Sequence, residues 1–383
     1  MKITDIKATF VEIPFPQTFY PTWRPAGEKG QGAVIVEIAT DEGVTGIGGM
    51  EANWGWGKVL LTTVEHMIKP QFVGKDPIRT EYLIKILRGI SLFSARPWLI
   101  ENALWDIVGK VCQQPIYKLW GASQDKIRAY AAWGEIRPPE RRAEDALRLV
   151  EEGFKAVKIR IHQEKMKDDV ALVEAVRKAV GDRLEIMVDA NQATAPERPG
   201  DPKFYPVWDY ARAKATAREL ERLGVLWLEE PLARYDIQGL SKLAAEMDIL
   251  IAGGEMNKGL HEFKWLLDHG CYDIIQPNCT FSEGMFQVRK LAAVAETYYK
   301  RCIPHAWTSG PGFVANLQVA GSIPGCDYIE YPYDPPAFLV ESLQGTLQEP
   351  LLRIDKEGYV HLPQKPGLGV ELNREAMERY KVA

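Results

Sequence analysis

Eight short apolar segments recur through the last two thirds of the chain, and each is followed by a stretch long enough for a helix. They cover residues 126–134, 156–161, 185–191, 226–231, 249–255, 272–278, 301–307 and 327–333. Spacings of roughly 20 to 35 residues suit parallel strands joined by crossover helices. Eight such units predict an α/β fold with a (β/α)8-type TIM barrel rather than an open sheet.

The first third of the chain has a different pattern. Residues 1 to about 60 alternate apolar and polar positions, which indicates antiparallel strands, and from about 59 to 122 apolar residues recur every three or four positions. We therefore predict an N-terminal α+β capping domain over residues 1–122 and a barrel over 123–354. A tail of about 355–383 is expected to return to the first domain.

Composition and charge exclude several classes of function. The net charge of −5 over 383 residues argues against a nucleic-acid partner. No apolar run reaches the roughly 18 residues that a membrane helix needs, and the first residues lack the layout of a signal peptide. The 5 cysteines are odd in number and show no CxxC spacing, which is typical of reduced thiols. We expect a cytoplasmic enzyme that binds neither membrane nor nucleic acid.

Polar residues gather at the ends of the barrel strands, where the active sites of such barrels lie. Side chains alternate along a strand, so residues two apart share a face, and only one of two adjacent glutamates can enter the site. In chain order the polar residues are Lys158 and Arg160, Asp189 and Asn191, Glu229 and Glu230, Glu255, Asn278, His305 and Glu330.

Three carboxylates on consecutive strands would repel one another without a cation between them. They are Asp189, one of the Glu229/Glu230 pair, and Glu255. Any one of them alone is explained as well by a helix cap or a solvated loop. Three in succession, facing a Lys-x-Arg pair and a histidine, indicate a hard cation with oxygen ligands, namely Mg²⁺.

The order of the motifs carries a family resemblance over nearly the whole chain. The segments are "ALWDIVGK", "AVKIR", "MVDANQ", "LEEP", "AGGE", "PHAW", "YIEY" and "PGLGVE". With these the chain resembles the enolase superfamily, in its mandelate racemase/muconate lactonizing enzyme-like group and there in the mandelate racemase subgroup. The resemblance implies a modified (β/α)7β barrel, a capping domain and a homo-oligomer, either dimer or octamer.

The resemblance also implies roles for individual residues. It assigns Mg²⁺ binding to Asp189, Glu229 and Glu255, and it places Glu330 as an acidic group opposite the metal. Lys158 would contact the substrate carboxylate, and His305 would be the base.

Arg160 departs from the family pattern, which often has a second, basic lysine at this position. Arginine stays protonated at ordinary pH, so Arg160 can clamp a carboxylate or hydroxyl but is a poor base. Racemisation needs a base on each face of the carbon, whereas a syn dehydration can use His305 for both proton transfers. The substitution therefore favours a dehydratase.

Asn278 is a second departure, since the family commonly has an aspartate paired with the histidine there. An asparagine can accept a hydrogen bond from an imidazole N–H and hold one tautomer, but it cannot stabilise an imidazolium by charge. We expect a lower pKa for His305 or a different partner.

Substrate contacts are expected from Asn191, from Trp307 and from the loops of the capping domain. In the resembled family such loops close over the substrate, so Trp23, Arg24 and Trp54 are candidates. A role as plain connecting loops explains these residues equally well.

These residues predict Mg²⁺-dependent abstraction of the proton α to a carboxylate through an enediolate. The favoured reaction is dehydration of a small-molecule sugar acid to a 2-keto-3-deoxy acid. One alternative is a racemase or epimerase of a 2-hydroxy acid, with Lys158 or an unrecognised group as second base. The other is a protein that binds metal and an acid ligand without turnover.

Overall fold

The computed structural model describes residues 1–24, 26–53, 55–197 and 206–382. Trp54, one of the predicted substrate contacts, lies outside the described residues. No helix in the described ranges is long and apolar enough to cross a bilayer.

An antiparallel sheet with helices on it forms the N-terminal part. Along its strands buried Val11 and Ile13 alternate with exposed Glu12 and Pro14, as a sheet with one covered face requires. The strands are β1 (Ile3–Phe19), β2 (Glu28–Thr40) and β3 (Thr45–Glu51), hydrogen-bonded in that order. The helices are α1 (Trp56–Thr63), a π-helical segment (Val64–Ile68), α2 (Lys69–Phe72), α3 (Thr80–Ser91), α4 (Leu99–Val111) and α5 (Ile116–Leu119).

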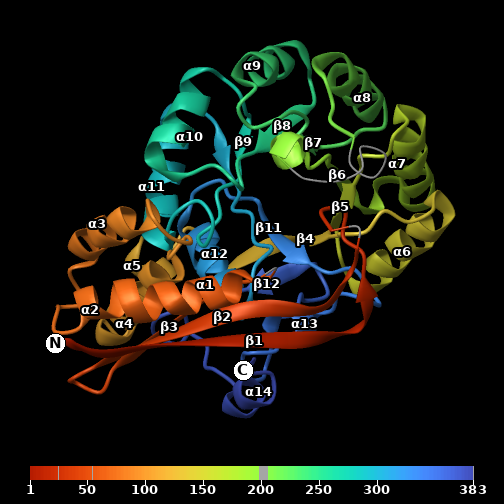
Figure 1. Cartoon of the computed structure of the whole chain (residues 1–383). Coiled ribbons are helices and arrows are strands. Elements are labelled where there is room, and N and C mark those ends of the chain that lie inside the picture. The colour runs from red at the N-terminus through yellow and green to blue at the C-terminus, as the bar shows by residue number, and fades with distance from the viewer. Residues whose placement is uncertain (25, 54, 198–205, 383) are drawn as a thin grey trace.

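The eight predicted barrel strands are all present, which confirms the α/β barrel. They are β4 (Lys126–Ala132), β5 (Ala156–Arg160), β6 (Glu185–Asp189), β7 (Trp227–Glu229), β8 (Leu250–Gly253), β9 (Ile274–Ile275), β10 (Arg301–Cys302) and β11 (Tyr328–Pro332). They form a parallel sheet in the order β10-β9-β8-β7-β6-β5-β4-β11, and the sheet curls round on itself (Figure 1). Their near-continuous apolar runs fit strands covered on both faces.

A helix follows every barrel strand. These are α6 (Pro139–Glu152), α7 (Met166–Val180), α8 (Tyr210–Arg222), α9 (Ile237–Glu246), α10 (Gly259–Asp268), α11 (Met285–Thr297), α12 (Gly310–Ser322) and α13 (Val340–Gln344), with 3₁₀ turns at Gly181–Arg183 and Gln192–Glu197. Every residue of α12 is buried, because this helix packs between barrel and capping sheet. A Cβ at Gly312 would lie 2.7 Å from the carbonyl oxygen of Gly49 in β3, so only glycine permits this approach.

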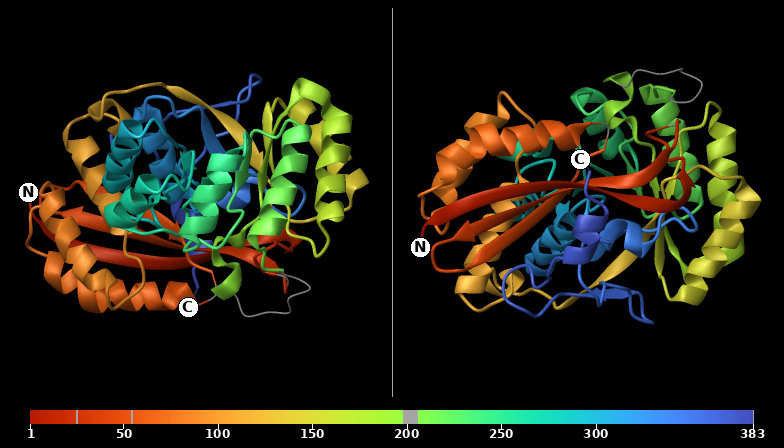
Figure 2. Two further views of the ribbon diagram at one scale, coloured as in Figure 1. Left: turned by 90° about the horizontal axis from the view of Figure 1, so that it is seen from above. Right: turned by 60° about the horizontal axis from the view of Figure 1, so that its bottom comes forward.

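The C-terminal tail contacts both parts of the molecule. Strand β12 (Tyr359–His361) pairs antiparallel with β4, and α14 (Arg374–Arg379) follows. The last residues lie on β1, where the backbone N–H of Val382 donates to the carbonyl of Phe10 at 2.9 Å. In Figure 2 the capping sheet runs along one side of the barrel with the C-terminus against it. Where to divide the chain into domains remains our prediction.

Loops of the capping sheet reach the carboxyl ends of the barrel strands. In the β1–β2 connection the N–H of Thr22 donates to the carbonyl of Gly134 at 2.9 Å. The hydroxyl of the same residue donates to Asn191 Oδ1 at 3.1 Å. The barrel end that carries the polar residues is therefore covered by the capping domain.

Candidate active site

Lys158 lies at the centre of the predicted site and is fully buried. Its Nζ is 2.7 Å from Glu229 Oε1, 2.7 Å from Glu330 Oε1 and 3.6 Å from Asp189 Oδ2. A buried ammonium persists only when it is paired, and here one cation faces three carboxylates. The structure thus brings four of the predicted residues together.

Strand register explains why these side chains meet. Arg160 is paired with Asp189 across β5 and β6, and Asp189 with Glu229 across β6 and β7. Residues at one level of a parallel sheet point to the same side, so the strands deliver them as a row.

Of the Glu229/Glu230 pair, Glu229 belongs to this row through its contact with Lys158. Glu229 Oε2 accepts hydrogen bonds from Gln276 Nε2 at 2.8 Å and from Trp227 Nε1 at 3.3 Å. Glu230 follows the strand with a left-handed φ of 47°.

Arg160 is a buried guanidinium rather than a flexible base. Its Nη1 pairs with Asp189 and also donates to Asn191 Oδ1 at 3.1 Å, and its Nε donates to the carbonyl of Trp133 at 2.9 Å. The rings of Trp23 and Trp307 lie 5.1 and 5.7 Å from its Cζ, close enough for cation–π contact.

His305 faces two carboxylates. Its Nε2 is 2.9 Å from Glu255 Oε2 and 3.4 Å from Glu330 Oε2. Burial lowers the pKa of His305, but the charges of Glu255 and Glu330 outweigh burial and raise that pKa to about 9. Glu330 is held in place by the backbone N–H groups of Ala306 and Trp307, at 2.8 and 3.1 Å.

Asn278 contacts His305 as expected, but with the opposite hydrogen-bond sense. Its Oδ1 accepts from the backbone N–H of Thr280 at 2.7 Å and from the Thr280 hydroxyl at 2.8 Å. The backbone N–H can only donate, so the amide NH₂ faces His305 Nδ1, at 2.8 Å. The expectation that Asn278 accepts from the imidazole is therefore wrong. In its neutral form, which prevails above its pKa of about 9, His305 accepts at Nδ1 and carries its proton on Nε2.

The predicted metal ligands are carboxylates, as a magnesium site requires, but their side chains form ion pairs with cations of the protein itself. Asp189, Glu229 and Glu255 are buried carboxylates at or just after the ends of three adjacent strands, and Glu255 Oε2 lies 2.9 Å from His305 Nε2. As placed, Lys158, Arg160 and His305 occupy them, and in the described ranges no three His, Cys, Asp or Glu side chains lie close enough to share a metal. The hard oxygen donors fit Mg²⁺.

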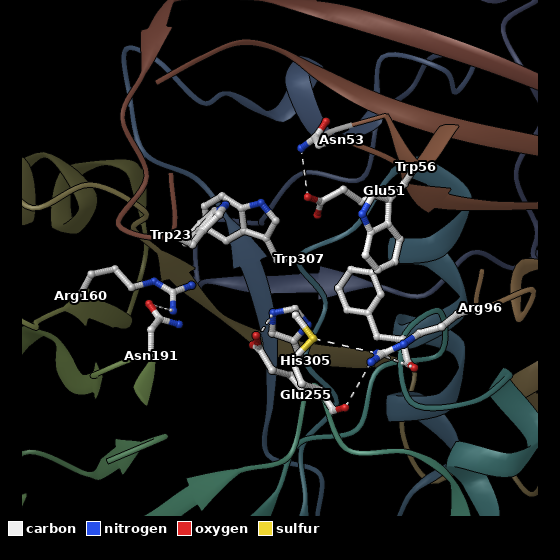
Figure 3. Close-up of a pocket in the computed structure, with 12 residues that line it drawn as sticks. Trp23, Glu51, Asn53, Trp56, Arg96, Arg160, Asn191, Glu255, His305 and Trp307 are labelled. Atoms are coloured by element: carbon white, nitrogen blue, oxygen red, sulfur yellow. Dashed lines mark hydrogen bonds and ion pairs between the residues drawn. The ribbon is translucent and has the colours of Figure 1, made fainter. Parts of the chain in front are cut away.

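A pocket opens between this row and the capping domain (Figure 3). Of the predicted substrate contacts, Trp23, Asn191 and Trp307 line it. Arg24 is not among the lining residues, and its Nη1 is 3.2 Å from Glu28 Oε1. The structure thus places three of the described candidates at the pocket and one outside it.

Sequence reasoning missed half of the pocket. The missed lining residues are Glu51, Asn53, Trp56, Arg96, Met256 and Phe281. Glu51 ends a strand, as the barrel residues do, and that signal was available. Burial and then the charge of Glu28 raise the pKa of Glu51 to about 8. Arg96 lies in a loop with no pattern, and only the fold brings it to the pocket.

Two family descriptions match the chain. Residues 141–376 match the enolase C-terminal domain-like family, and residues 25–121 match the N-terminal domain of mandelate racemase and muconate lactonizing enzyme. The chain belongs to this family of the enolase superfamily, which confirms the resemblance.

Several relatives of the chain are named as sugar acid dehydratases. The arabinonate dehydratase of Saccharolobus solfataricus is 29% identical over 91% of this chain and 90% of its own length. The D-xylonate dehydratase of Haloferax volcanii is 30% identical over 100% and 89%. Among solved structures, a putative mandelate racemase from Bordetella bronchiseptica RB50 is 28% identical over 100% and 95%, with a TM-score of 0.87. An L-talarate dehydratase from Polaromonas sp. JS666, complexed with Mg and L-glucarate, is 25% identical over 100% and 98%, with a TM-score of 0.82.

Other relatives are a D-galactarolactone cycloisomerase and an N-succinyl-L-Arg/Lys racemase. The chain is therefore an enzyme, of the lyase or racemase type, rather than a protein that binds without turnover.

Proposed function

We propose that this enzyme dehydrates a sugar acid to a 2-keto-3-deoxy acid, with Mg²⁺ as cofactor. The observation that carries the proposal is the buried row formed by Lys158, Arg160 and the strand-end carboxylates beside His305. Two relatives that match nine tenths or more of the chain are sugar acid dehydratases, which supports the same reaction.

Asp189, Glu229 and Glu255 would hold the metal. A bound divalent cation supplies charge that stabilises the dianionic enediolate formed when the α proton leaves. The protein's own cations serve the same charge: Lys158 and Arg160 would orient the substrate carboxylate.

His305 would take the α proton at Nε2 and return it to the departing β-hydroxyl, so that water and an enol form and the enol becomes the keto acid. To accept a proton at Nε2, His305 must carry its own proton on Nδ1. The Asn278 amide NH₂ faces Nδ1 in the structure, so the Asn278 side chain must first turn its oxygen toward the ring. That turn leaves the Thr280 N–H unpaired, at a cost of about 1–3 kcal/mol.

Racemisation is the second candidate. Arg160 is locked by Asp189, Asn191 and Trp133 and stays protonated, so it offers no base on the opposite face. Lys158 would have to serve instead, while it faces three carboxylates. The geometry therefore favours the dehydratase.

The test is incubation of the enzyme with Mg²⁺ and a panel of sugar acids in D₂O. Keto-acid product supports the dehydratase, whereas α-deuterated stereoisomers without keto acid support the racemase. His305→Ala should abolish both product and exchange, while His269→Ala, an exposed histidine at the end of α10, should change neither. Full activity in His305→Ala would rule out His305 as the base.

A further inference from the structure

Arg96 reaches the pocket from the segment that joins α3 to α4. Its Nη1 donates to the carbonyl of Phe281 at 2.8 Å, and its Nη2 donates to the carbonyl of Met256 at 3.4 Å. These contacts fix the guanidinium next to Glu255, in the loop after β8, and beside Phe281, whose ring lies 6.2 Å from that of His305. Figure 3 shows Arg96 and Arg160 on opposite sides of the pocket, with His305 and Glu255 between them.

Arg96 forms no direct ion pair with a carboxylate among the described residues, whereas Arg160 pairs with Asp189. The recorded contacts of Arg96 are two backbone carbonyls and the sulfur of Met256. Burial and then Arg234 lower the pKa of Arg96, against a smaller opposing effect of the Glu262 and Glu255 carboxylates, and Arg96 in turn lowers the pKa of Lys258. Two carbonyls satisfy hydrogen bonds but do not neutralise a cation.

We infer that Arg96 binds a second carboxylate at the far end of the substrate, so that the enzyme acts on dicarboxylic sugar acids. The inference rests on the proposed function for the reacting end, where Lys158 and Arg160 would take the first carboxylate. A guanidinium matches a carboxylate with two parallel N–H donors. A chain with a carboxylate at each end would then lie across His305.

The capping side of the pocket also suits a substrate that is anionic and carries hydroxyl groups. Glu51 lines the pocket on the capping side, and its Oε1 accepts from Asn53 Nδ2 at 3.0 Å. Because its pKa is raised to about 8, the carboxyl is neutral near pH 7 and can donate to a hydroxyl without repelling an anion. If Arg96 only held three loops together, its replacement would lower kcat/KM by the same factor for every substrate.

Matched substrates separate the two roles. Galactarate and galactonate share their stereocentres and differ in whether the last carbon is a carboxylate. We expect wild-type kcat/KM to favour the diacid, and Arg96→Met to lower kcat/KM for the diacid by about 10- to 100-fold while changing the monoacid little. Arg88→Met is the control, because Arg88 also bridges the two domains, through Glu283 at 2.5 Å, but does not line the pocket. It should leave the diacid-to-monoacid ratio unchanged.

A binding measurement that requires no turnover tests this inference separately from the proposed reaction. Calorimetry with Mg²⁺ present compares adipate with hexanoate, acids that have no hydroxyl to lose. Adipate should bind about tenfold tighter to the wild type and no tighter than hexanoate to Arg96→Met. Turnover of monoacids alone, with equal binding of adipate and hexanoate, overturns the diacid inference and leaves the dehydratase intact. Preference for adipate without any turnover supports the anion site and counts against the dehydratase.

Discussion

The two walls of the pocket are built on different principles. On the barrel wall the charged groups form ion pairs with one another: Lys158 faces Asp189, Glu229 and Glu330, and His305 faces Glu255. On the capping wall the groups are aromatic rings, the carboxyl of Glu51, whose pKa is raised, and Arg96, which forms no ion pair with a described carboxylate. Charges that compensate one another are suited to a reaction step that many substrates share. An uncompensated group is suited to recognising one particular substrate.

The supports of the two walls differ in the same way. Lys158, Asp189 and Glu229 stand on hydrogen-bonded strands, whose register fixes their side chains relative to one another. On the capping side, Trp23 and Arg96 stand on loops, which a few hydrogen bonds hold in place, such as those of Thr22 to Gly134 and Asn191. We therefore expect changes in the barrel wall to affect kcat for every acid, and changes in the capping wall to affect selectivity.

The largest effect is expected at the centre of the barrel wall. Lys158→Met removes the cation that faces three buried carboxylates and that, in the proposed reaction, contacts the substrate carboxylate. We expect kcat/KM to fall at least about 10⁴-fold for all acids, measured by keto-acid formation with Mg²⁺. The control is Lys155→Met, an exposed lysine just before the same strand, which should keep full activity. A loss confined to some acids would break the contrast between the walls.

The contrast also explains how far the sequence could go. A barrel strand is recognised in the sequence by a short apolar run. The polar residue at or just after its end is then found by counting, as with Asp189 and Glu255. Residues on loops carry no period, so Arg96 and Phe281 could not be assigned before the fold brought positions 96 and 281 together.

Hydrogen-bond direction was likewise beyond the sequence. The side chain of Asn278 is oriented by the backbone N–H of Thr280, and backbone donors are present at almost every residue. Which of them is free depends on the turn after β9, which residue identities alone do not determine.

The second largest effect is expected on the free energy of unfolding, where the N-terminal part contacts the barrel. Glu101 on α4 is fully buried, and burial raises its pKa to about 8 from 4.5. The folded state therefore holds a proton that the unfolded chain releases above about pH 4.5, so stability falls as pH rises from there to about 8. A pKa change of this size corresponds to at most about 5 kcal/mol.

Glu101→Gln should remove this loss. We expect it to match the wild type at pH 5 and to raise the free energy of unfolding by about 2 kcal/mol at pH 8, measured by denaturant titration. Glu81→Gln, which replaces an exposed carboxyl 2.5 Å from Lys290, is the control; it keeps Glu101, so its free energy of unfolding should fall between pH 5 and pH 8 as that of the wild type does. Equal stability of Glu101→Gln and wild type at pH 8 would contradict a protonated Glu101.

A smaller effect is expected beside His305. In Asn278→Asp the carboxylate can accept from Nδ1–H and from the Thr280 N–H together, so protonating the ring no longer requires the side chain to turn. We expect the plateau value of kcat across pH to rise about tenfold, which corresponds to about 1.4 kcal/mol. The gain must vanish when His305 is also replaced by alanine. A lower plateau in Asn278→Asp would indicate that His305 works as a donor from Nε2.

The smallest effect is expected on the capping wall. Trp23 covers the Arg160 guanidinium with its ring centroid 5.1 Å away and packs edge-on against Trp307 at 5.0 Å. Trp23→Phe keeps an aromatic ring but loses area and part of the cation–π contact, worth about 0.5–1 kcal/mol. We expect KM to rise about three- to fivefold with kcat unchanged, and no change in Trp265→Phe, a half-exposed residue on α10. A fall in kcat with KM constant would place this loop in the reaction step, because an interaction made only in the transition state affects kcat. The capping wall would then share in the chemistry, and the division between the two walls would not hold.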